Sequence, residues 1–243
     1  MIGVAIPAHD EAATLAACLR SVLRAASHPR LRGEPVRIVV VLDDCSDEST
    51  SIAARFPVAP LAIRARNVGR ARAVAVEELI RHGARWIACT DADSIVNADW
   101  LAAQLALDRD AFCGAVAVDW HGQASWLRRR YESRYVDADG HRHIHGANLG
   151  FRAAAYRRCG GFPALAAHED VALVRALERQ GATIGWSARP RVTTSARLTP
   201  RVRGGFGDYL AMLAAACRPT AYRVPLATGD DTRSPRQLRI RTA

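Results

Sequence analysis

The sequence predicts an α/β fold with a mostly parallel central sheet flanked by helices, and three observations predict it. Apolar segments typical of strands alternate with helical segments four times within residues 1–110. Residues 36–42 are rich in β-branched side chains, which is typical of a strand buried on both faces of a sheet. With 243 residues, of which 49% are hydrophobic and 24% charged, the chain can build one large packed core.

The four strand and helix units follow one another along the first half. Pro7 is expected to end the first strand, and Asp10 with Glu11 opens a helical stretch whose apolar face includes Leu15 and Leu19. The expected units are strand 2–6 with a helix from 10 to 23, strand 36–42 with helix 47–56, strand 61–64 with a helix ending near 81, and strand 85–89 with helix 98–107.

Polar residues follow each of these strands, at 9–11, 43–47, 67–72 and 91–93. In parallel α/β sheets, ligands bind beyond the carboxyl ends of the strands, where the loops that lead into the helices gather. We therefore expect the four polar loops to converge on one rim of the sheet and to form a binding site there.

In the second half of the chain, strands and helices no longer alternate regularly, and we interpret this half as an extension that faces a substrate. Its expected elements are strand 112–118, a mixed arm at 125–135, a turn at 139–140 leading into 141–145, a small-residue segment at 146–150, helix 153–159, a Gly and Pro break at 160–163 and helix 168–180. No repeat or flexible linker divides the sequence. We expect one domain over 1–218, with halves at 1–110 and 111–218, and a basic tail at 219–243 without a fixed core contact.

The formal net charge is +10, and all 34 basic residues are Arg because the chain has no Lys. A basic balance suits nucleic acid, a membrane surface or an anionic small substrate, and Arg enrichment can equally reflect a GC-rich genome. The sequence has no apolar run that could span a membrane and no secretion signal at its start, so we expect a cytoplasmic protein. Six Cys, 24 or more positions apart, show no zinc-type spacing and are interpreted as small buried hydrophobic residues.

Two carboxylates, Asp91 and Asp93, follow the fourth strand in the segment CTDADS. The D-x-D spacing occurs three times, and about one occurrence is expected by chance. The other two pairs are explained by a helix end and by a turn before Gly140. At a buried rim two carboxylates cost free energy unless a cation offsets them, and Mg²⁺ and Mn²⁺ prefer carboxylate oxygens. The alternative is that Asp93 caps the next helix, although Asp99 is better placed for that.

Taken together, the loops resemble the motifs of the family 2 glycosyltransferases. Six motifs occur in the family's order over roughly residues 2 to 180. They are PAHDE at 7–11, VLDDCSD at 41–47, NVGRARA at 67–73, DAD at 91–93, GANLGFR at 146–152 and HED at 168–170. Cys45 stands where the family usually has Gly, and Asp10 where it has Asn. No QxxRW segment follows Asp170, so a processive membrane polymer synthase is not expected.

The resemblance implies a GT-A type fold with a nucleotide-binding half at 1–110 and an acceptor-facing half at 111–218. It implies a hexosyl-type transfer from a nucleoside diphosphate sugar to a hydroxyl of a small-molecule, lipid or glycan acceptor, with inversion and with Mg²⁺ or Mn²⁺. Asp93 would bind the metal on the diphosphate, and Asp91 would lie beside it near the ribose or sugar. The nucleotide-sugar contacts carried over from the motifs are Pro7, His9, Glu11, Asp43, Asp44, Asn67, Arg72, Asp91, Gly146, Ala147 and Asn148.

Displacement of a diphosphate needs stabilised charge on the leaving group and a base for the acceptor hydroxyl. The resemblance assigns the base to Asp170, with Glu169 beside it. At a helix start the dipole favours ionised carboxylates, and the alternative is that both are only favourable first-turn acids. Small residues at 146–148 would let the donor approach the backbone closely, although a tight turn needs the same residues.

Two segments keep open interpretations. His141, His143 and His145 alternate, so a strand would place them on one face, either as a polar strand edge or as zinc ligands. His145 and His168 are alternatively contacts to the donor or acceptor. The basic segment 197–205 is either a fold over the diphosphate or a solvated loop.

Two other functions compete with glycosyl transfer. A sugar nucleotidyltransferase shares the nucleotide-binding sheet, but its GxGTR start is absent and a chain without Lys cannot supply its signature Lys. A nucleic-acid-binding protein accounts for the charge of +10 but not for acidic loops at the rim. The motifs therefore favour the glycosyltransferase.

Overall fold

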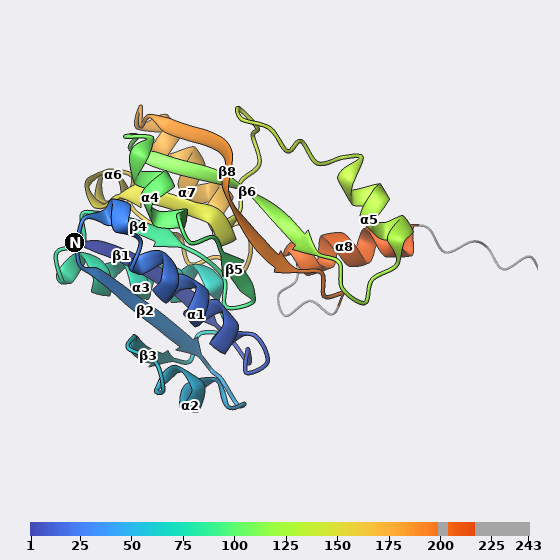
Figure 1. The fold of residues 1–243 in the computed structure, drawn as a ribbon, viewed down its shortest axis with the longest axis horizontal. Helices are drawn as coiled ribbons and strands as arrows, with labels where there is room; N and C mark the ends of the chain where they lie inside the picture. The colour runs from blue at the N-terminus through green and yellow to red at the C-terminus, as the bar shows by residue number, and fades with distance from the viewer. Residues whose placement is uncertain (199–203, 217–243) are drawn as a thin grey trace, which may run out of the picture.

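A computed structural model describes residues 1–198 and 204–216. The expectations for the tail at 219–243 and for residues 199–203 of the basic segment lie outside the described residues. The described chain forms one eight-stranded sheet in the order β3, β2, β1, β4, β7, β6, β8, β5, with helices on both faces (Figure 1). The strands are β1 (Ile2–Ala8), β2 (Val36–Asp43), β3 (Ala59–Ile63), β4 (Trp86–Cys89), β5 (Ser94–Val96), β6 (Ala111–Asp119), β7 (Leu149–Arg152) and β8 (Ile184–Ser195).

The first half confirms the parallel sheet that the sequence predicts. Strand β1 pairs in parallel with β2 and β4, and β2 pairs in parallel with β3. Its helices are α1 (Leu15–Ala26), α2 (Ser49–Ala53), α3 (Val68–Arg81) and α4 (Trp100–Ala106). Because all four strands run the same way, the loops that leave them meet at one edge of the sheet.

Two boundaries in the first unit differ from the prediction. Strand β1 continues through Pro7 to Ala8 because its pairing with β4 ends at Ala5, so no partner requires an N–H from Pro7 on that side. Helix α1 begins at Leu15 rather than at Asp10. Asp10 has a left-handed backbone with φ of 51°, so the segment before α1 is a loop that turns toward β2.

The second half closes the sheet with strands of mixed direction. Strand β7 is antiparallel to β4 and β6, whereas β8 is parallel to β6 and antiparallel to β5. The sequence predicted β6 but not β5, β7 or β8. A register shift occurs between Gly114 and Val116, where two steps along β6 face the five from Ser187 to Val192, so the extra residues form a bulge in β8.

Two large cores lie on opposite faces of the sheet. One core joins α1 and α4 to the sheet through side chains such as Leu19 and Trp100. The other core joins α3 to α6 (Ala153–Arg158) and α7 (Glu169–Arg179), and includes Leu79, Phe151 and Leu173. These layers fix the positions of the loops at the carboxyl edge.

A third and smaller core lies beyond the end of the sheet, where α5 (Ser125–Glu132) packs on α8 (Phe206–Ala215). Figure 1 shows these two helices side by side as an arm that β6 and β8 support. The short 3₁₀ helices η1 (Pro29–Leu31) and η2 (Gly146–Asn148) complete the elements. The arm that the sequence predicted at 125–135 thus begins with a helix, and α8 was not predicted.

Residues 141–145, where a strand would have placed three His on one face, form no strand in the structure. His141, His143 and His145 instead form an irregular segment in which neighbouring rings stack at centroid distances of 5.5 and 6.0 Å. The ring of Tyr135 stacks on His143 at 4.2 Å. Ring contacts rather than ladder hydrogen bonds therefore order this segment, and it joins the arm to η2.

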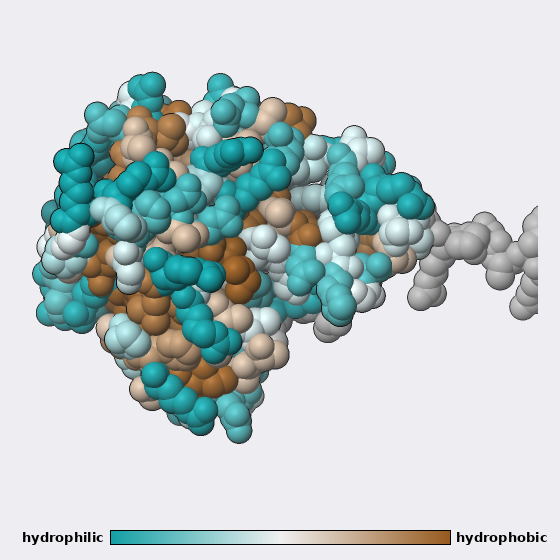
Figure 2. All heavy atoms as spheres, in the orientation of Figure 1, coloured by the Kyte–Doolittle hydropathy of each residue, from teal (hydrophilic) through white to brown (hydrophobic). Residues whose placement is uncertain are grey.

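Within residues 1–198 and 204–216, no helix has the length and apolar content needed to cross a membrane. Figure 2 shows hydrophilic side chains over much of one face, with hydrophobic ones between them. The five Cys of this part of the chain are free thiols, and Cys18, Cys89 and Cys113 are buried as the sequence predicts. Burial raises the pKa of each of these three thiols, so they behave as apolar side chains.

Candidate active site

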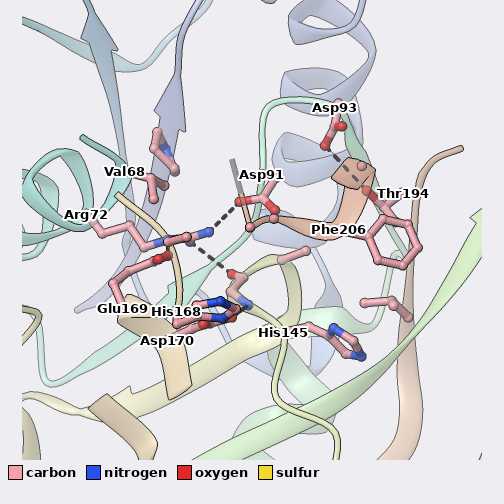
Figure 3. A pocket seen from close by; sticks show the side chains of 18 of the residues that line it. Val68, Arg72, Asp91, Asp93, His145, His168, Glu169, Asp170, Thr194 and Phe206 are labelled. Atoms are coloured by element: carbon pink, nitrogen blue, oxygen red, sulfur yellow. Dashed lines mark hydrogen bonds and ion pairs between the residues drawn. The ribbon is translucent and has the colours of Figure 1, made fainter. Parts of the chain in front are cut away.

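A cavity of about 670 Å³ opens at the carboxyl edge of the parallel strands. Residues from β1, β2 and the loop after β4 line one end of it, and residues from α5, α8 and the segment 141–145 line the other (Figure 3). We call the first the donor end, after the nucleotide-sugar contacts that the resemblance implies there, and the second the ring-lined end. The sequence-predicted residues that line the cavity are Pro7, His9, Glu11, Asp43, Asn67, Arg72, Asp91, Asp93, Gly146, Ala147, Glu169 and Asp170.

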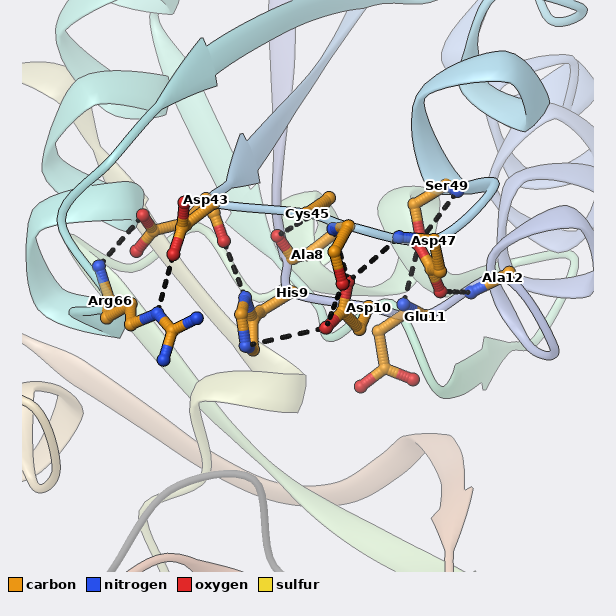
Figure 4. A network of polar contacts seen from close by, with 12 residues as sticks. Ala8, His9, Asp10, Glu11, Ala12, Asp43, Cys45, Asp47, Ser49 and Arg66 are labelled. Atoms are coloured by element: carbon orange, nitrogen blue, oxygen red, sulfur yellow. Dashed lines mark hydrogen bonds and ion pairs between the residues drawn. The ribbon is translucent and has the colours of Figure 1, made fainter.

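Asp43, the last residue of β2, is buried at the donor end and organises the loop before α3 (Figure 4). Its Oδ1 accepts the backbone N–H groups of Ala65 and Arg66 at 2.7 and 2.9 Å, and its Oδ2 accepts that of Asn67 at 2.8 Å. The ring of His9 hydrogen-bonds the backbone oxygen of Asp43 at 2.6 Å. One carboxylate therefore fixes the floor of the expected nucleoside pocket.

The loop after β1 is tied to the loop after β2 by two acidic side chains (Figure 4). Oδ1 of Asp10 accepts the backbone N–H of Ser46 at 2.7 Å, and Oδ2 of Asp47 accepts that of Ala12 at 2.8 Å. The backbone hydrogen bond from Ser46 lowers the pKa of Asp10. Asp10, which stands where the family usually has Asn, thus links the loop after β1 to the loop after β2.

Arg72 of α3 connects the parts of the site (Figure 3). Only 3% of it is exposed, and it donates from Nε to Glu169 at 2.9 Å, from Nη1 to the backbone oxygen of Gly146 at 3.0 Å and from Nη2 to Asp91 at 2.5 Å. Burial alone would lower the pKa of Arg72, but the charges of Asp91 and Glu169 outweigh burial and raise it. Arg72 therefore stays cationic and locks three segments together.

The space around Arg72 explains the small residue in the GANLG motif. A Cβ added to Gly146 would lie 2.3 Å from Nη2 of Arg72, which is far inside van der Waals contact. Gly146 has no left-handed backbone that would call for glycine. The guanidinium that lies against the backbone is therefore the reason for glycine here.

Asp93 lies close to other acidic side chains. Burial and the nearby charge of Asp91 raise the pKa of Asp93 to about 6, while Arg197 opposes that rise. Nη2 of Arg197 lies 3.2 Å from Oδ2 of Asp93, and Oγ1 of Thr194 contacts Oδ1 at 3.4 Å (Figure 3). Glu11 lies close enough to add to the repulsion. Crowded, nearly buried carboxylates of this kind fit a hard divalent cation such as Mg²⁺ or Mn²⁺.

Asp170 and Glu169 begin α7 but differ in their surroundings. Glu169 is buried and paired with Arg72. Asp170 is half-buried and lines the cavity, and its Oδ2 accepts the backbone N–H of Gly146 at 2.7 Å. His168 precedes them with a left-handed backbone, φ 63°, which aims the helix start at the cavity. Asp170 is thus the accessible carboxylate of the two.

The structure places two predicted contact residues away from the cavity lining. Asn148 is fully buried, and its side chain accepts from Trp100 and donates to the backbone oxygens of Ala115 and Pro190. Asp44 lies outside the lining and pairs with Arg66. Asn148 therefore cross-links β6, β8 and α4 beneath the site, and of the residues 146–148 only Gly146 and Ala147 line the cavity.

The ring-lined end was not predicted as a unit. Tyr131 and Tyr135 stack at 5.2 Å, and the hydroxyl of Tyr135 hydrogen-bonds Nε2 of His145 at 3.1 Å. Burial lowers the pKa of His145 to about 3, so its imidazole stays neutral. The rings that line this end come from three separate segments and are Tyr131, Tyr135, His143, His145, Phe206 and Tyr209.

The comparisons with known proteins agree with this geometry. The sequence matches the family described as "Glycosyl transferase family 2" over residues 3–160, more than half of the chain. The chain belongs to glycosyl transferase family 2. No curated protein matches it. Family 2 membership decides against the sugar nucleotidyltransferase and the nucleic-acid-binding protein as alternatives.

Solved structures show that this family 2 glycosyltransferase has the GT-A type fold. S. aureus TarS 1-349 in complex with UDP is 14% identical, with a TM-score of 0.62 over 81% of this chain and 61% of the TarS 1-349 chain. The complex with UDP-GlcNAc is 15% identical, with a TM-score of 0.62 over 88% and 65%. Mannosyltransferase PcManGT from Pyrobaculum calidifontis with GDP-Man and Mn²⁺ is 18% identical, with a TM-score of 0.58 over 80% and 56%. The chain spans less than two thirds of each.

Proposed function

We propose that this protein transfers a hexosyl group from a nucleoside diphosphate sugar to an acceptor hydroxyl, with inversion and with Mg²⁺ or Mn²⁺. The observation that carries the proposal is the convergence of Asp91, Asp93 and Asp170 on one cavity at the carboxyl edge of a parallel sheet. Related structures with UDP, UDP-GlcNAc, or GDP-Man and Mn²⁺ support it.

The donor end provides the contacts for the nucleotide. Pro7 lies near the end of β1, His9 and Glu11 follow in the next loop, and Asp43 and Asn67 belong to the same lining. Because backbone hydrogen bonds already hold Asp43, this end is organised before a ligand arrives, which lowers the entropic cost of binding.

Asp93, with Asp91 beside it, would hold the divalent cation. A bound Mg²⁺ or Mn²⁺ would neutralise charge on the departing diphosphate. Asp91 is fixed by the buried Arg72, whereas Asp93 contacts two hydroxyl groups and the partly exposed Arg197. The chain therefore supplies one carboxylate held by a buried cation and one held by an accessible cation.

Asp170 would act as the base. Its carboxylate takes the proton of the acceptor hydroxyl while that oxygen bonds to the anomeric carbon and the bond to the diphosphate oxygen breaks. The backbone N–H of Gly146 orients the Asp170 carboxylate. Glu169 would act as a positioning residue, since its buried carboxylate holds Arg72 and through it Asp91 and Gly146.

The ring-lined end would receive the acceptor. It adjoins Asp170 in the same cavity, and its lining residues come from α5, α8 and the segment 141–145. Tyr131 is almost fully buried, but Tyr209 is 36% exposed, so part of the ring surface is accessible to a ligand. Rings of this kind pack against apolar faces and offer hydroxyl groups at their edges.

A thermal-shift panel of UDP, GDP, ADP and their sugars, each with Mn²⁺ or with a chelator, tests the proposal. One nucleotide family should raise the unfolding temperature, and the chelator should remove most of that shift because the diphosphate is held through the cation. A shift that is equal with the chelator contradicts the metal role. No shift with any nucleotide contradicts the proposed donor.

A further inference from the structure

Arg197 lies at the donor end, two residues beyond the end of β8, and its guanidinium bridges two carboxylates. Nη1 lies 2.8 Å from Oε1 of Glu11, and Nη2 lies 3.2 Å from Oδ2 of Asp93. The side chains of Glu11 and Asp93 are only 7% and 10% exposed, whereas that of Arg197 is 32% exposed. The two acids are therefore inside the protein, and the arginine reaches them from the cavity.

Because of these two contacts, the guanidinium of Arg197 and a metal cation would compete for the same carboxylate oxygens. Asp93 is nearly buried and lies near both Asp91 and Glu11, so a positive charge beside these carboxylates lowers their free energy. In the structure Arg197 supplies that charge. A divalent cation bound to Asp93 would repel a guanidinium a few ångströms away and compete for the oxygen that Arg197 now contacts.

We propose that Arg197 is a displaceable counter-cation, which holds Glu11 and Asp93 until the donor and its metal bind together. The inference rests on the proposed function and adds to it that the metal and the nucleotide bind together. The metal alone binds weakly because it must displace Arg197 without compensation. When a nucleoside diphosphate brings the metal, the guanidinium exchanges carboxylates for diphosphate oxygens, which its planar fork matches.

The exchange also accounts for the position of Glu11. While Arg197 contacts both of its carboxylate oxygens, Glu11 is engaged at the mouth of the nucleoside pocket. Departure of Arg197 removes its contacts with these oxygens at the moment when the diphosphate arrives, while Thr14 still donates to Oε2 of Glu11. Metal and nucleotide are then coupled ligands, and by reciprocity each tightens the other by the same factor.

The test measures Mn²⁺ binding by the electron paramagnetic resonance signal of free Mn²⁺, first without nucleotide and then with UDP or GDP. Arg197→Gln removes the charge and keeps most of the length, and Arg197→Lys keeps the charge. Arg191→Gln is the matched control, because Arg191 is also an arginine of the β8 region paired with a carboxylate, Asp137, but lies outside the cavity. Circular dichroism verifies that each variant is folded.

Arg197→Gln should tighten Mn²⁺ binding without nucleotide by about tenfold and should weaken nucleotide binding with Mn²⁺, so that the coupling between the two ligands falls. Arg197→Lys and Arg191→Gln should bind Mn²⁺ alone as the parent does. Unchanged or weaker binding of Mn²⁺ alone by Arg197→Gln overturns the inference. If the parent protein binds no nucleotide, the proposed function fails, and the measurement with Mn²⁺ alone still decides whether Arg197 competes with the metal.

Discussion

The two ends of the cavity are built in different ways. At the donor end, short loops leave parallel strands, and buried carboxylates such as Asp43 fix them through backbone N–H groups. At the ring-lined end, Tyr135, His145 and Tyr209 come from separate segments that are held mainly by contacts between rings. The difference teaches that one end is defined by the backbone and the other by side-chain packing, so substitutions should act differently on them.

We expect the largest effect at Asp170, where the two ends of the cavity meet, because a substitution there should change turnover without changing nucleotide binding. Asp170→Asn keeps an oxygen for the N–H of Gly146 but cannot take a proton, so turnover should fall by roughly 10²- to 10⁴-fold with nucleotide affinity unchanged. Initial rates and nucleotide titrations measure the two quantities. Asp108→Asn, at an exposed carboxylate outside the cavity, is the control. Retained turnover in Asp170→Asn would place the base elsewhere.

The next effect would test whether the donor end depends on one buried cation. Arg72→Met leaves the buried Glu169 and its neighbour Asp91 unpaired, so the free energy of unfolding should drop by about 3–5 kcal/mol in urea titrations. Arg66→Met removes an exposed pair with Asp44 and should cost less than about 1 kcal/mol. Similar losses of unfolding free energy in the two variants would mean that the buried network around Arg72 stabilises the protein no more than an exposed ion pair does.

A smaller effect would sharpen the reason for glycine at the donor end. Gly146→Ala places a Cβ against Arg72, and such overpacking should cost about 1–3 kcal/mol of unfolding free energy and weaken nucleotide binding. Repeating Gly146→Ala in the Arg72→Met background forms a double-mutant cycle. The cost should shrink there, because the atom that the Cβ meets is gone. An equal cost in both backgrounds would place the strain in the backbone.

The smallest expected effect lies at the ring-lined end. Tyr209→Ala removes the most exposed of the rings and should raise the KM for the acceptor used in the transfer assay by about 2- to 10-fold, with the donor KM unchanged. Met212→Ala, on an exposed part of the same helix but outside the lining, should change neither KM. If Tyr209→Ala shifts the donor KM instead, the two ends do not divide the substrates as proposed.

The sequence predicted the parallel half of the fold because its apolar and amphipathic periods match the strands and helices there. Strand β8 escaped prediction because Arg189, Pro190 and Arg191 lie in its middle and look like a loop. Strand β6 pairs with β8 on both sides of that segment, at residues 184–187 and 192–195, and β5 pairs with residues 192–194, so distant partners hold the two flanks as one strand. Pairing between distant segments thus overrides local preference.

The site residues likewise divide into those that local sequence patterns predicted and those that they did not. Residues at the ends of strands, such as Asp43 and Asp91, line the cavity as predicted, because strand direction places them at the edge. Asn148 turns inward to bond Trp100, and no local pattern reveals which way such a side chain points. The ring-lined end and the partners of Arg197 had no signal of period or spacing, because they depend on segments that meet only in three dimensions.

The pairing of β5 with β8 joins two segments that the ribosome synthesises far apart in time. Ser94 pairs with Thr194, and Thr194 contacts Asp93 across a separation of 101 residues. A ribosome therefore releases the loop of Asp93 long before the strand that supports it, and contacts so distant in sequence form late in folding. A partly translated chain can assemble the parallel strands, but the carboxylate proposed to bind the metal gains its contacts with Thr194 and Arg197 only when the end of β8 has emerged.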